Sequence, residues 1–334
     1  DFDETLPGPW EWDVKRLAAS LVIAARDNDL GAKHADRAAA AACRSYREHM
    51  GTFADMRHLD LFYYRIAADE VLDHASGAAR PHFEQMLGKA RTRTNDKAFA
   101  KMVEFVDGSH RLKVEPPLTT PLDDDRLDAA VRRLVEDYRP TLKPDRRLLL
   151  SRYSVVDVAH KVVGVGSVGR RCYVVFLLGS DQDDPLFLQV KEAQASVLEP
   201  YAGPPTQASN GERVVVGQRL TQAASDLFLG WCVGPSTHRT YYVRQLWDVK
   251  GQSDVLKMDA GNLSHYAALC GWALARAHAR TGDPVQLAAY LGGGDAFDRA
   301  IVAFSAAYAA TNAADHKALL DAIASGRVEA EFLG

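Results

Sequence analysis

A block of strand-like segments between two helix-rich blocks is the feature that most restricts the fold of this chain. Five segments within residues 151–251 are rich in β-branched and aromatic residues and are separated by Gly, Asp and Pro. They are RYSVVDVAHKVVGVGSVG, RRCYVVFLLG, PLFLQVKEA, DLFLGWCV and RTYYVRQLWDVKG. NGERVVVGQRLTQAAS interrupts them and reads as a helix, with Asn210 as its candidate cap. The sequence therefore predicts an α+β protein with an antiparallel sheet lobe.

Helical periodicity dominates on both sides of this block. Apolar residues recur at helical spacing from Trp12 to about Gly108 and again from Gly261 onwards. The prolines of GSHRLKVEPPLTTPLDDD predict a linker, which a short helix follows from about Asp125 to Arg139. We therefore expect the first part of a helical lobe at 1–125, a connecting helix at 126–141, the sheet lobe at 142–252, and the second part of the helical lobe at 253–334.

Composition narrows the class of protein. The 334 residues are 47% hydrophobic, enough for a large core in two or more units. The net charge of −4 gives no whole-chain electrostatic case for nucleic acid, and no apolar run approaches the roughly 20 residues of a membrane helix. Four widely spaced cysteines are typical of buried thiols in a reducing compartment rather than of a zinc or disulfide site. We expect a cytoplasmic protein with neither a nucleic-acid nor a membrane partner.

A glycine-rich loop joins the first two strand-like segments. Gly164, Gly166 and Gly169 satisfy G-x-G-x-x-G, but a strand follows them, whereas a dinucleotide-binding fingerprint leads into a helix. A hairpin carrying this loop is the arrangement of protein kinases, in which backbone N–H groups cover nucleotide phosphates. Glycine lets the backbone approach because it has no Cβ. We predict that these glycines and Ser167 contact phosphates; a hairpin that binds nothing is the alternative.

Lys191 ends LFLQVK, the apolar part of the next strand-like segment. A kinase-like lobe places its phosphate-pairing lysine on the third strand, after the glycine hairpin. We therefore predict that Lys191 contacts nucleotide phosphates, with a solvated strand-end lysine as the alternative. Such an ammonium needs a carboxylate to hold it, and the candidates are Glu192, Glu199 and Glu212, with Glu212 placed on the helix that follows.

Two further regions bear on a nucleotide site. The exit of the last strand corresponds to the hinge that meets adenine in kinases, which places Gln245 and Leu246 near the base. His278 lies on an alanine-rich helix and is read as a core or interface histidine rather than as a catalytic base.

The chain opens on a dense acidic motif, DFDETLPGPWEWD. A magnesium site, a solvated acidic turn and a helix-capping cluster all fit this composition, but the apolar Phe2, Trp10 and Trp12 indicate a packed segment. The spacing resembles that of aminoglycoside- and choline-kinase-type enzymes, which carry I-D-F-[DE] and, about a dozen residues later, an Asp that opens a helix. By this resemblance Asp1 is the Mg²⁺ ligand, Asp3 a supporting or second-metal carboxylate and Asp13 a structural orienter.

Nearly the whole chain resembles an uncharacterised bacterial family, domain of unknown function 2252. The matching segments are DFDETLPGPWEWDVKRLAASLVIAAR, KVVGVGSVGRRCYVVFLLG, PLFLQVKEAQASVLEP, GQRLTQAASDLFLGW, YYVRQLWDVKG and CGWALARAHARTGD. Members of that family carry a G-D-x-H-x-x-N-F segment shortly before the acidic motif, and it is similar to the catalytic loop of aminoglycoside-type kinases. We therefore expect the natural protein to continue upstream and to supply the catalytic base there.

The order of these parts implies a rearranged kinase. The metal aspartate comes first, and the glycine loop and lysine follow some 160 residues later. A circular permutation of a two-lobed protein-kinase-like fold explains this order. The resemblance thus implies an ATP- and Mg²⁺-dependent phosphotransferase whose acceptor, a small molecule or a protein, is unknown. The alternatives are a nucleotide-binding regulatory or scaffold protein without catalysis, and a structural α+β domain without a ligand.

Overall fold

The computed structural model is a mixed α+β structure with antiparallel sheets, 57% helix and 15% strand. It describes residues 2–74, 79–91, 95–122, 124–162, 164, 169–181, 183–234, 237–246 and 253–330. The α+β class predicted from the sequence is confirmed. The chain divides into two compact units, a sheet unit of Asp1–Gly8 with Gln85–Gln252 and a helical unit of Pro9–Glu84 with Ser253–Gly334.

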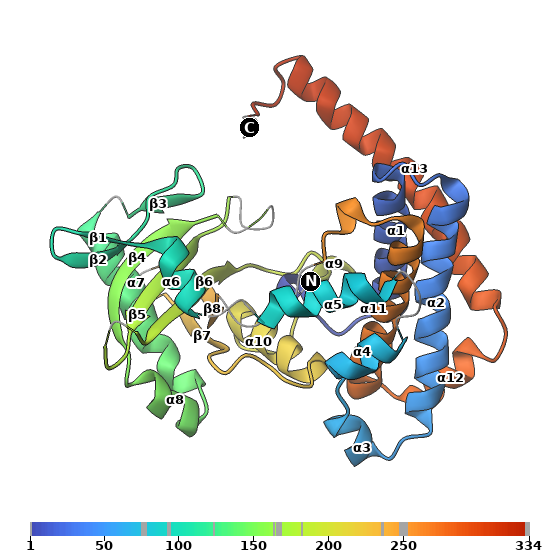
Figure 1. Ribbon diagram of the computed structural model, residues 1–334, viewed down its shortest axis with the longest axis horizontal. Helices are drawn as coiled ribbons and strands as arrows, with labels where there is room; N and C mark the ends of the chain where they lie inside the picture. Colours follow the sequence, from blue (N-terminus) through green and yellow to red (C-terminus); the bar gives the residue numbers. More distant parts are fainter. Residues whose placement is uncertain are drawn as a thin grey trace. The chain divides into compact units, whose positions relative to one another are not determined.

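A six-stranded antiparallel sheet forms the centre of the sheet unit (Figure 1). Its spatial order is β3-β4-β5-β6-β8-β7. The strands are β3 (Thr119–Pro121), β4 (Ser154–Lys161), β5 (Cys172–Leu178), β6 (Pro185–Ala193), β7 (Gly230–Val233) and β8 (Thr240–Gln245). All but β3 fall within the five segments predicted as strands, because alternation and turn residues marked them locally.

Three strands lie where the sequence predicted helix or linker. β1 (Val103–Val106) pairs with β2 (Ser109–Leu112), and the prediction of helix as far as Gly108 is wrong there. The turn between them is Asp107-Gly108, with φ of 49° and 80°, the pair of positive φ values that a two-residue hairpin turn requires. β3 pairs with β4 inside the predicted linker.

The two faces of the sheet are covered differently. One face packs its apolar side chains, such as Val175 and Leu188, against Val131 and Val135 of α7 (Asp125–Tyr138), the predicted short helix. On the other face the rings of Phe176 and Phe187 stack on each other and pack against α6 (Asn95–Met102). Alternation along a strand sends neighbouring residues to opposite faces, so this second face continues along β6 to Gln189 and Lys191.

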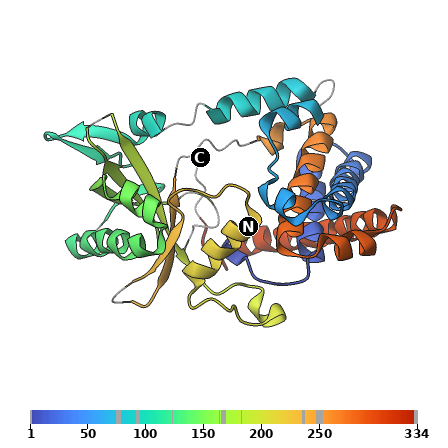
Figure 2. The same ribbon diagram turned by 90° about the horizontal axis from the view of Figure 1, so that it is seen from below.

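Helix α10 (Asn210–Thr221) packs on β7 and β8 and borders the start of the chain (Figure 2). Its N-cap is Ser209 rather than the predicted Asn210. The Ser209 hydroxyl accepts a hydrogen bond from the Glu212 backbone N–H, and the Glu212 carboxylate accepts one from the Ala208 backbone N–H at 3.1 Å. Ser209 has the extended backbone that a cap needs, whereas Asn210 is already helical.

The helical unit is built on α1 (Glu11–Asp27), α2 (Ala32–Ala54), α11 (Ala260–Thr281) and α13 (Ala296–Ala324), which run side by side in Figures 1 and 2. Small residues bring these helices close: a Cβ on Gly271 of α11 would lie 2.2 Å from the Ala42 backbone oxygen of α2. The other helical segments of the described chain belong partly to this unit and partly to the sheet unit: η1 (Phe2–Glu4), α3 (His58–Tyr63), α4 (Ala68–His74), α5 (Ala79–Arg91), η2 (Arg139–Thr141), α8 (Pro144–Leu150), α9 (Glu199–Ala202), η4 (Val255–Lys257) and α12 (Pro284–Leu291).

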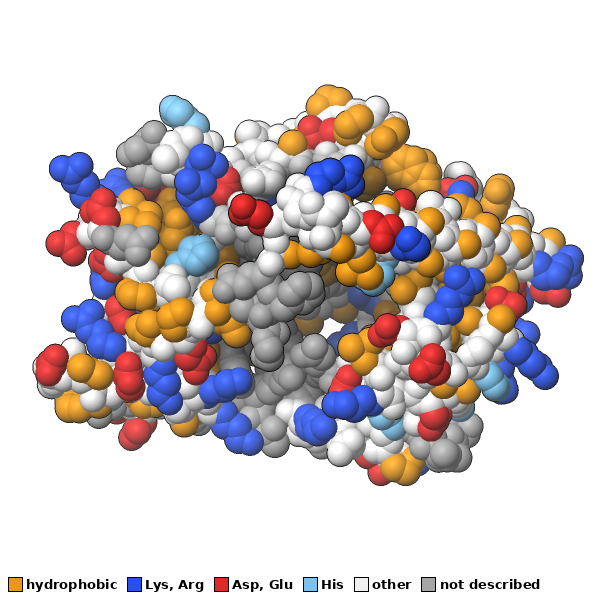
Figure 3. Space-filling view, turned by 90° about the horizontal axis from the view of Figure 1, so that it is seen from above, with side chains coloured by type: hydrophobic (Ala, Val, Ile, Leu, Met, Phe, Trp, Pro, Cys, Tyr) orange, Lys and Arg blue, Asp and Glu red, His pale blue; other side chains and the backbone are white. Residues whose placement is uncertain are grey.

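The surface carries charges of both signs. Lys and Arg side chains are interspersed with Asp and Glu over the described part of the face shown in Figure 3. Within the described ranges, no helix combines the length and the apolar character needed to cross a membrane.

Candidate functional site

The beginning of the chain meets the end of β6 within the sheet unit. Lys191 Nζ donates a hydrogen bond to Asp3 Oδ2, and the Tyr242 hydroxyl donates to Asp3 Oδ1 at 2.8 Å. Arg170 Nη1 lies 3.9 Å from Asp3 Oδ2. One carboxylate, two cations and a phenol therefore converge from four separate stretches of sequence.

The sheet register explains why the donors share one face. Lys191 on β6 lies opposite Cys172 on β5 and Tyr242 on β8, so the three side chains are cross-strand neighbours. Two residues earlier on β6, Gln189 donates to Cys172 Sγ at 3.2 Å and accepts from Arg244 Nε at 2.9 Å. The second face of the sheet thus changes from aromatic to polar as it approaches Lys191.

Arg213 of α10 fixes the turn that carries Asp3. Its guanidinium donates to three backbone oxygens, those of Asp3 at 2.9 Å, Thr5 at 2.6 Å and Gln194 at 2.8 Å. The side chain is 2% exposed, and a buried cation is tolerated only where hydrogen bonds replace its hydration. Burial lowers the pKa of Arg213 from its ordinary value. The residue therefore joins three segments at one buried point.

Glu4 adds a second set of anchors to the same turn. Its carboxylate lies 3.4 Å from Arg170 Nη2 and accepts from the Val197 backbone N–H at 2.9 Å, and its backbone oxygen accepts from Ser196 Oγ at 2.8 Å. Phe2 packs on the apolar cluster formed by α10, β7 and β8. The acidic start is therefore packed, as its apolar residues predicted.

Burial and hydrogen bonding act in opposite directions on Asp3. Burial raises the pKa of its carboxyl, but the hydrogen bonds from Lys191 and Tyr242 and the charges of Lys191 and Arg170 outweigh that effect, so the pKa lies below its ordinary value. Burial raises the pKa of Tyr242, and the neighbouring Asp3 raises it further. At neutral pH the pair is an ionised carboxylate and a neutral phenol donor.

The glycine hairpin ends beside this cluster. β4 and β5 are antiparallel neighbours, so the segment that carries the glycines connects two paired strands. Gly169 has φ +73°, a left-handed conformation that favours glycine, and Arg170 follows it directly. Gly164 is exposed, and Gly166 and Ser167 lie outside the described residues. Phosphate contact by the four loop residues therefore stays a prediction.

The carboxylate paired with Lys191 is Asp3 and none of the three glutamates considered from the sequence. The three are engaged elsewhere: Glu192 pairs with Arg239 at 2.8 Å and Arg171 at 3.7 Å, Glu199 accepts from the Ser196 backbone N–H at 2.9 Å, and Glu212 accepts from the Ala208 backbone N–H. Each glutamate is held by a group closer to it in the fold than Lys191.

The predicted hinge residues use their backbone donors inside the protein. The Gln245 N–H donates to Asp226 Oδ2 at 2.6 Å, and the Leu246 N–H donates to the Phe187 backbone oxygen at 2.9 Å. An adenine ring near these residues would therefore have to use other groups, and their assignment to the base stays a prediction. Asp1 lies outside the described residues, so its role as a metal ligand also stays a prediction.

Three residues of the cluster were missed from the sequence. Arg170 had a local signal, because it directly follows the last glycine of the loop. Tyr242 and Arg213 had none, since a strand tyrosine and a helix arginine are common, and only the register and the packing of α10 bring them to Asp3.

The described residues of this cluster could hold a magnesium ion only together with other ligands, such as phosphate oxygens. In the parts of the chain that the structure describes, no group of three or more His, Cys, Asp or Glu side chains is arranged to hold a metal ion. Asp3 offers one carboxylate, whose two oxygens already accept from Lys191 and Tyr242. Mg²⁺ commonly takes one or two carboxylates together with substrate phosphates and water. The donor set of the described residues therefore fits a cation that arrives with a phosphate.

Comparison with known proteins identifies a family. The family model for uncharacterized proteins conserved in bacteria, DUF2252, matches residues 1–322. The chain belongs to the DUF2252 family. Neither the search of curated proteins nor the search of solved structures found a match. The DUF2252 match contains Asp3, Arg170, Lys191, Arg213 and Tyr242, so the whole cluster lies within the family region.

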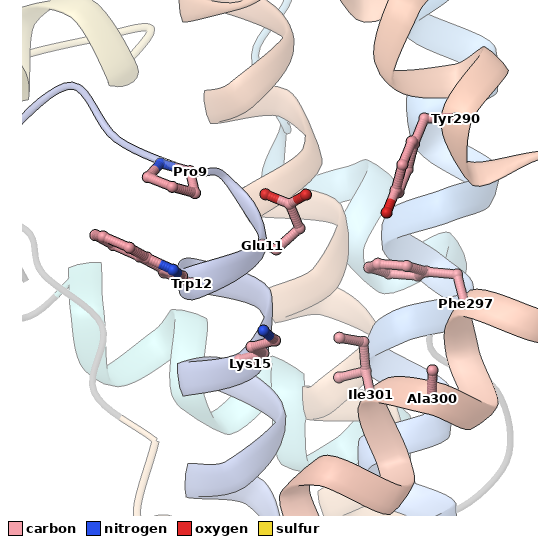
Figure 4. Close-up of a pocket in the computed structure, with 8 residues that line it drawn as sticks. All are labelled: Pro9, Glu11, Trp12, Lys15, Tyr290, Phe297, Ala300 and Ile301. Atoms are coloured by element: carbon pink, nitrogen blue, oxygen red, sulfur yellow. The ribbon is translucent and has the colours of Figure 1, made fainter. Parts of the chain in front are cut away.

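The helical unit of this DUF2252 chain holds a separate pocket of about 350 Å³ (Figure 4). It lies between the first turns of α1 and the helices α12 and α13, and no predicted site residue lines it. Its walls are Pro9, Glu11, Trp12, Lys15, Tyr290, Phe297, Ala300 and Ile301.

Asp13 belongs to a polar array in the same unit. His278 Nε2 lies 3.1 Å from Asp13 Oδ2, and His278 Nδ1 lies 2.9 Å from the Tyr46 hydroxyl. Partial desolvation raises the pKa of the largely exposed Asp13 side chain, but the hydrogen bond and the charge of His278 lower that pKa by more, so the net shift is downward. His278 is 9% exposed, as predicted for a core histidine, and links α1 with α2 and α11.

Proposed function

We propose that this DUF2252 protein binds nucleotide phosphates at Lys191 and the glycine hairpin and takes part in ATP- and Mg²⁺-dependent phosphoryl transfer. The observation that carries the proposal is the contact of Lys191, on the strand that follows the glycine hairpin, with a carboxylate from the acidic start. Lys191 is only 9% exposed, so a solvated strand-end lysine does not describe it.

Phosphoryl transfer needs positioning and charge neutralisation more than covalent chemistry from the protein. In this proposal Lys191 and Arg170 neutralise phosphate charge, and the hairpin supplies backbone N–H donors. Asp1, the metal ligand by the kinase resemblance, and Asp3 would provide carboxylate oxygens for a magnesium ion bound with the phosphates, and that ion would supply further neutralisation. No residue of this chain is assigned as the base, which the kinase resemblance places in the G-D-x-H-x-x-N-F segment.

A circularly permuted, two-lobed kinase-like fold is part of the same proposal. The sheet unit corresponds to the nucleotide-binding lobe: an antiparallel sheet, a glycine hairpin between its first two long strands, and a lysine on the next strand. α10 takes the place of the helix that follows the lysine strand. Its residue next to the cluster is an arginine that holds the Asp3 turn, in contrast to the glutamate of the kinase arrangement.

Ligand-dependent thermal stabilisation tests the proposal. A ligand at 100 times its Kd adds about 2.7 kcal/mol to stability, which is readily measured as a rise in Tm. ATP with Mg²⁺ should raise the Tm of the wild type and of Lys113→Met, a control lysine of the sheet unit whose ammonium donates to the Ala100 backbone oxygen. The rise should be absent in Lys191→Met. A wild type that ATP does not stabilise, or a Lys191→Met variant that keeps the full rise, contradicts the proposal.

A nucleotide-binding protein without catalysis is the second candidate. Both Asp3 carboxylate oxygens accept hydrogen bonds from side chains of the protein, Lys191 and Tyr242. Asp3 therefore has a structural role, and this favours the second candidate. Transfer of the labelled γ-phosphate of ATP to acceptors from a bacterial extract separates the two candidates. Labelled product formed by a preparation that includes the G-D-x-H-x-x-N-F segment, and not by its Lys191→Met variant, supports the phosphotransferase.

A further inference from the structure

We propose that Asp3 is a built-in lock on the phosphate site: its carboxylate occupies the anion position of Lys191, and a divalent cation that draws Asp3 away opens that position for a phosphate. This inference rests on the proposed function. It adds that binding of the cation and binding of the nucleotide are coupled through one ion pair.

The geometry places the carboxylate where a phosphate oxygen would bind. Lys191 Nζ donates to Asp3 Oδ2, and the Lys191 and Asp3 side chains are 11% and 14% exposed. Carboxylate and phosphate oxygens use the same charge-assisted hydrogen bonds from an ammonium group. The ammonium has further N–H groups, but Asp3 already neutralises its positive charge, so a phosphate that reaches Lys191 competes with Asp3 for that charge.

The backbone beneath Asp3 is held too firmly for the whole turn to leave. Arg213 donates to the backbone oxygens of Asp3 and Thr5, and Ser196 donates to that of Glu4. The moving part is therefore the Asp3 side chain, retained on its far oxygen by the Tyr242 hydroxyl. The lock therefore opens when the Asp3 side chain alone rotates away from Lys191.

The coupling has a definite sign. Without a divalent cation, Asp3 is fully charged and neutralises Lys191, so phosphate binds weakly. With a cation on Asp3, the carboxylate charge is shared with the metal and Lys191 is released to the phosphate. Linkage makes the effect reciprocal, so nucleotide must strengthen cation binding by the same factor. Couplings of this kind are typically about 5- to 150-fold.

Calorimetric titration of the full chain with ATP tests the lock, with Mg²⁺ in one series and EDTA in the other. The wild type should bind ATP at least about tenfold more weakly in EDTA, within the usual range of such couplings. Asp3→Asn keeps the size of the side chain and removes its charge. It should bind ATP at least about fivefold more tightly than the wild type in EDTA, and its Mg²⁺ dependence should shrink by a similar factor. Glu199→Gln is the control for net charge, because its carboxylate accepts from the Ser196 backbone N–H and, among the described residues, forms no ion pair with Lys191.

Several results would overturn the lock. Weaker or unchanged binding of ATP by Asp3→Asn in EDTA shows that Asp3 does not compete with phosphate. An equal gain in Glu199→Gln shows that net charge alone is responsible. Should Asp3→Asn fail to fold, Tyr242→Phe, which releases only Asp3 Oδ1, should still strengthen binding in EDTA and keep the Mg²⁺ dependence; no gain there refutes the lock.

The lock and the proposed function fail in different ways. A wild type that binds no ATP in either series eliminates both. A wild type that binds ATP through Lys191, as shown by loss of binding in Lys191→Met, upholds the site; unaltered binding by Asp3→Asn in EDTA then eliminates the lock alone.

Discussion

Replacing Gly217 of α10 by alanine tests whether the first residues of the chain pack on this helix, because the added methyl group would meet Thr5. A Cβ built there would lie 2.3 Å from both Thr5 Oγ1 and Thr5 Cγ2, and 2.8 Å from Thr5 Cβ. Rotating the Thr5 side chain does not remove the contact with its Cβ, so the backbone of the turn must shift. Gly217→Ala should therefore displace the turn that carries both Thr5 and Asp3.

The magnitude follows from two opposing effects. Alanine in a helix interior is favoured over glycine by about 0.8–1.0 kcal/mol, whereas overpacking a filled site costs about 1–3 kcal/mol. Gly217→Ala should therefore destabilise the protein by up to about 2 kcal/mol. Gly51 of α2 has nothing within 4 Å of its built Cβ, so Gly51→Ala retains only the favourable effect.

Scanning calorimetry of both variants measures the difference. One kcal/mol corresponds to a shift in Tm of about 2–4 °C for a unit of 150–250 residues. Gly51→Ala should melt above the wild type, and Gly217→Ala at or below it and at least about 2 °C below Gly51→Ala. ATP with Mg²⁺ should also stabilise Gly217→Ala less than the wild type, because the turn that carries Asp3 is displaced. A Gly217→Ala variant as stable as Gly51→Ala refutes the docking of Thr5 on α10.

Three further changes probe other contacts. Arg213→Met leaves three backbone oxygens without their buried donor and should destabilise the protein by about 3 kcal/mol or more in urea denaturation; an unchanged midpoint would contradict that anchor. The folded-state pKa of Asp3 lies below its ordinary value of 3.8, so its stabilisation is present above pH 3.8 and lost as pH falls through the folded pKa. Tm measured from pH 6 to 2 should therefore fall more steeply for the wild type than for Asp3→Asn, and parallel curves would show that Asp3 gains nothing on folding. Tyr46→Phe removes a fully buried hydroxyl that bonds His278 Nδ1 and should cost about 1 kcal/mol, which a double-mutant cycle with His278→Gln checks: additive losses would mean that the pair does not interact.

Local patterns were sufficient to predict most elements of the sheet unit. Alternation in PLFLQVKEA and the turn residues around it predict β6 and place Lys191 at its end, because both signals act over a few residues. The hairpin of β1 and β2 carried an equally local signal in Asp107-Gly108, and it was overlooked because the flanking residues continue a helical pattern. β3 is three residues long, too short for alternation to be recognised.

The sequence by itself determined that a lysine would follow a glycine hairpin on the next strand and that a packed acidic turn would open the chain. Only the tertiary structure decided that these two features contact each other, across 188 residues, and that Tyr242 and Arg213 complete the contact. The choice of partner depends on strand order, on register and on where α10 packs. None of these is encoded within the few residues around Lys191, whose neighbouring glutamate is drawn instead to Arg239.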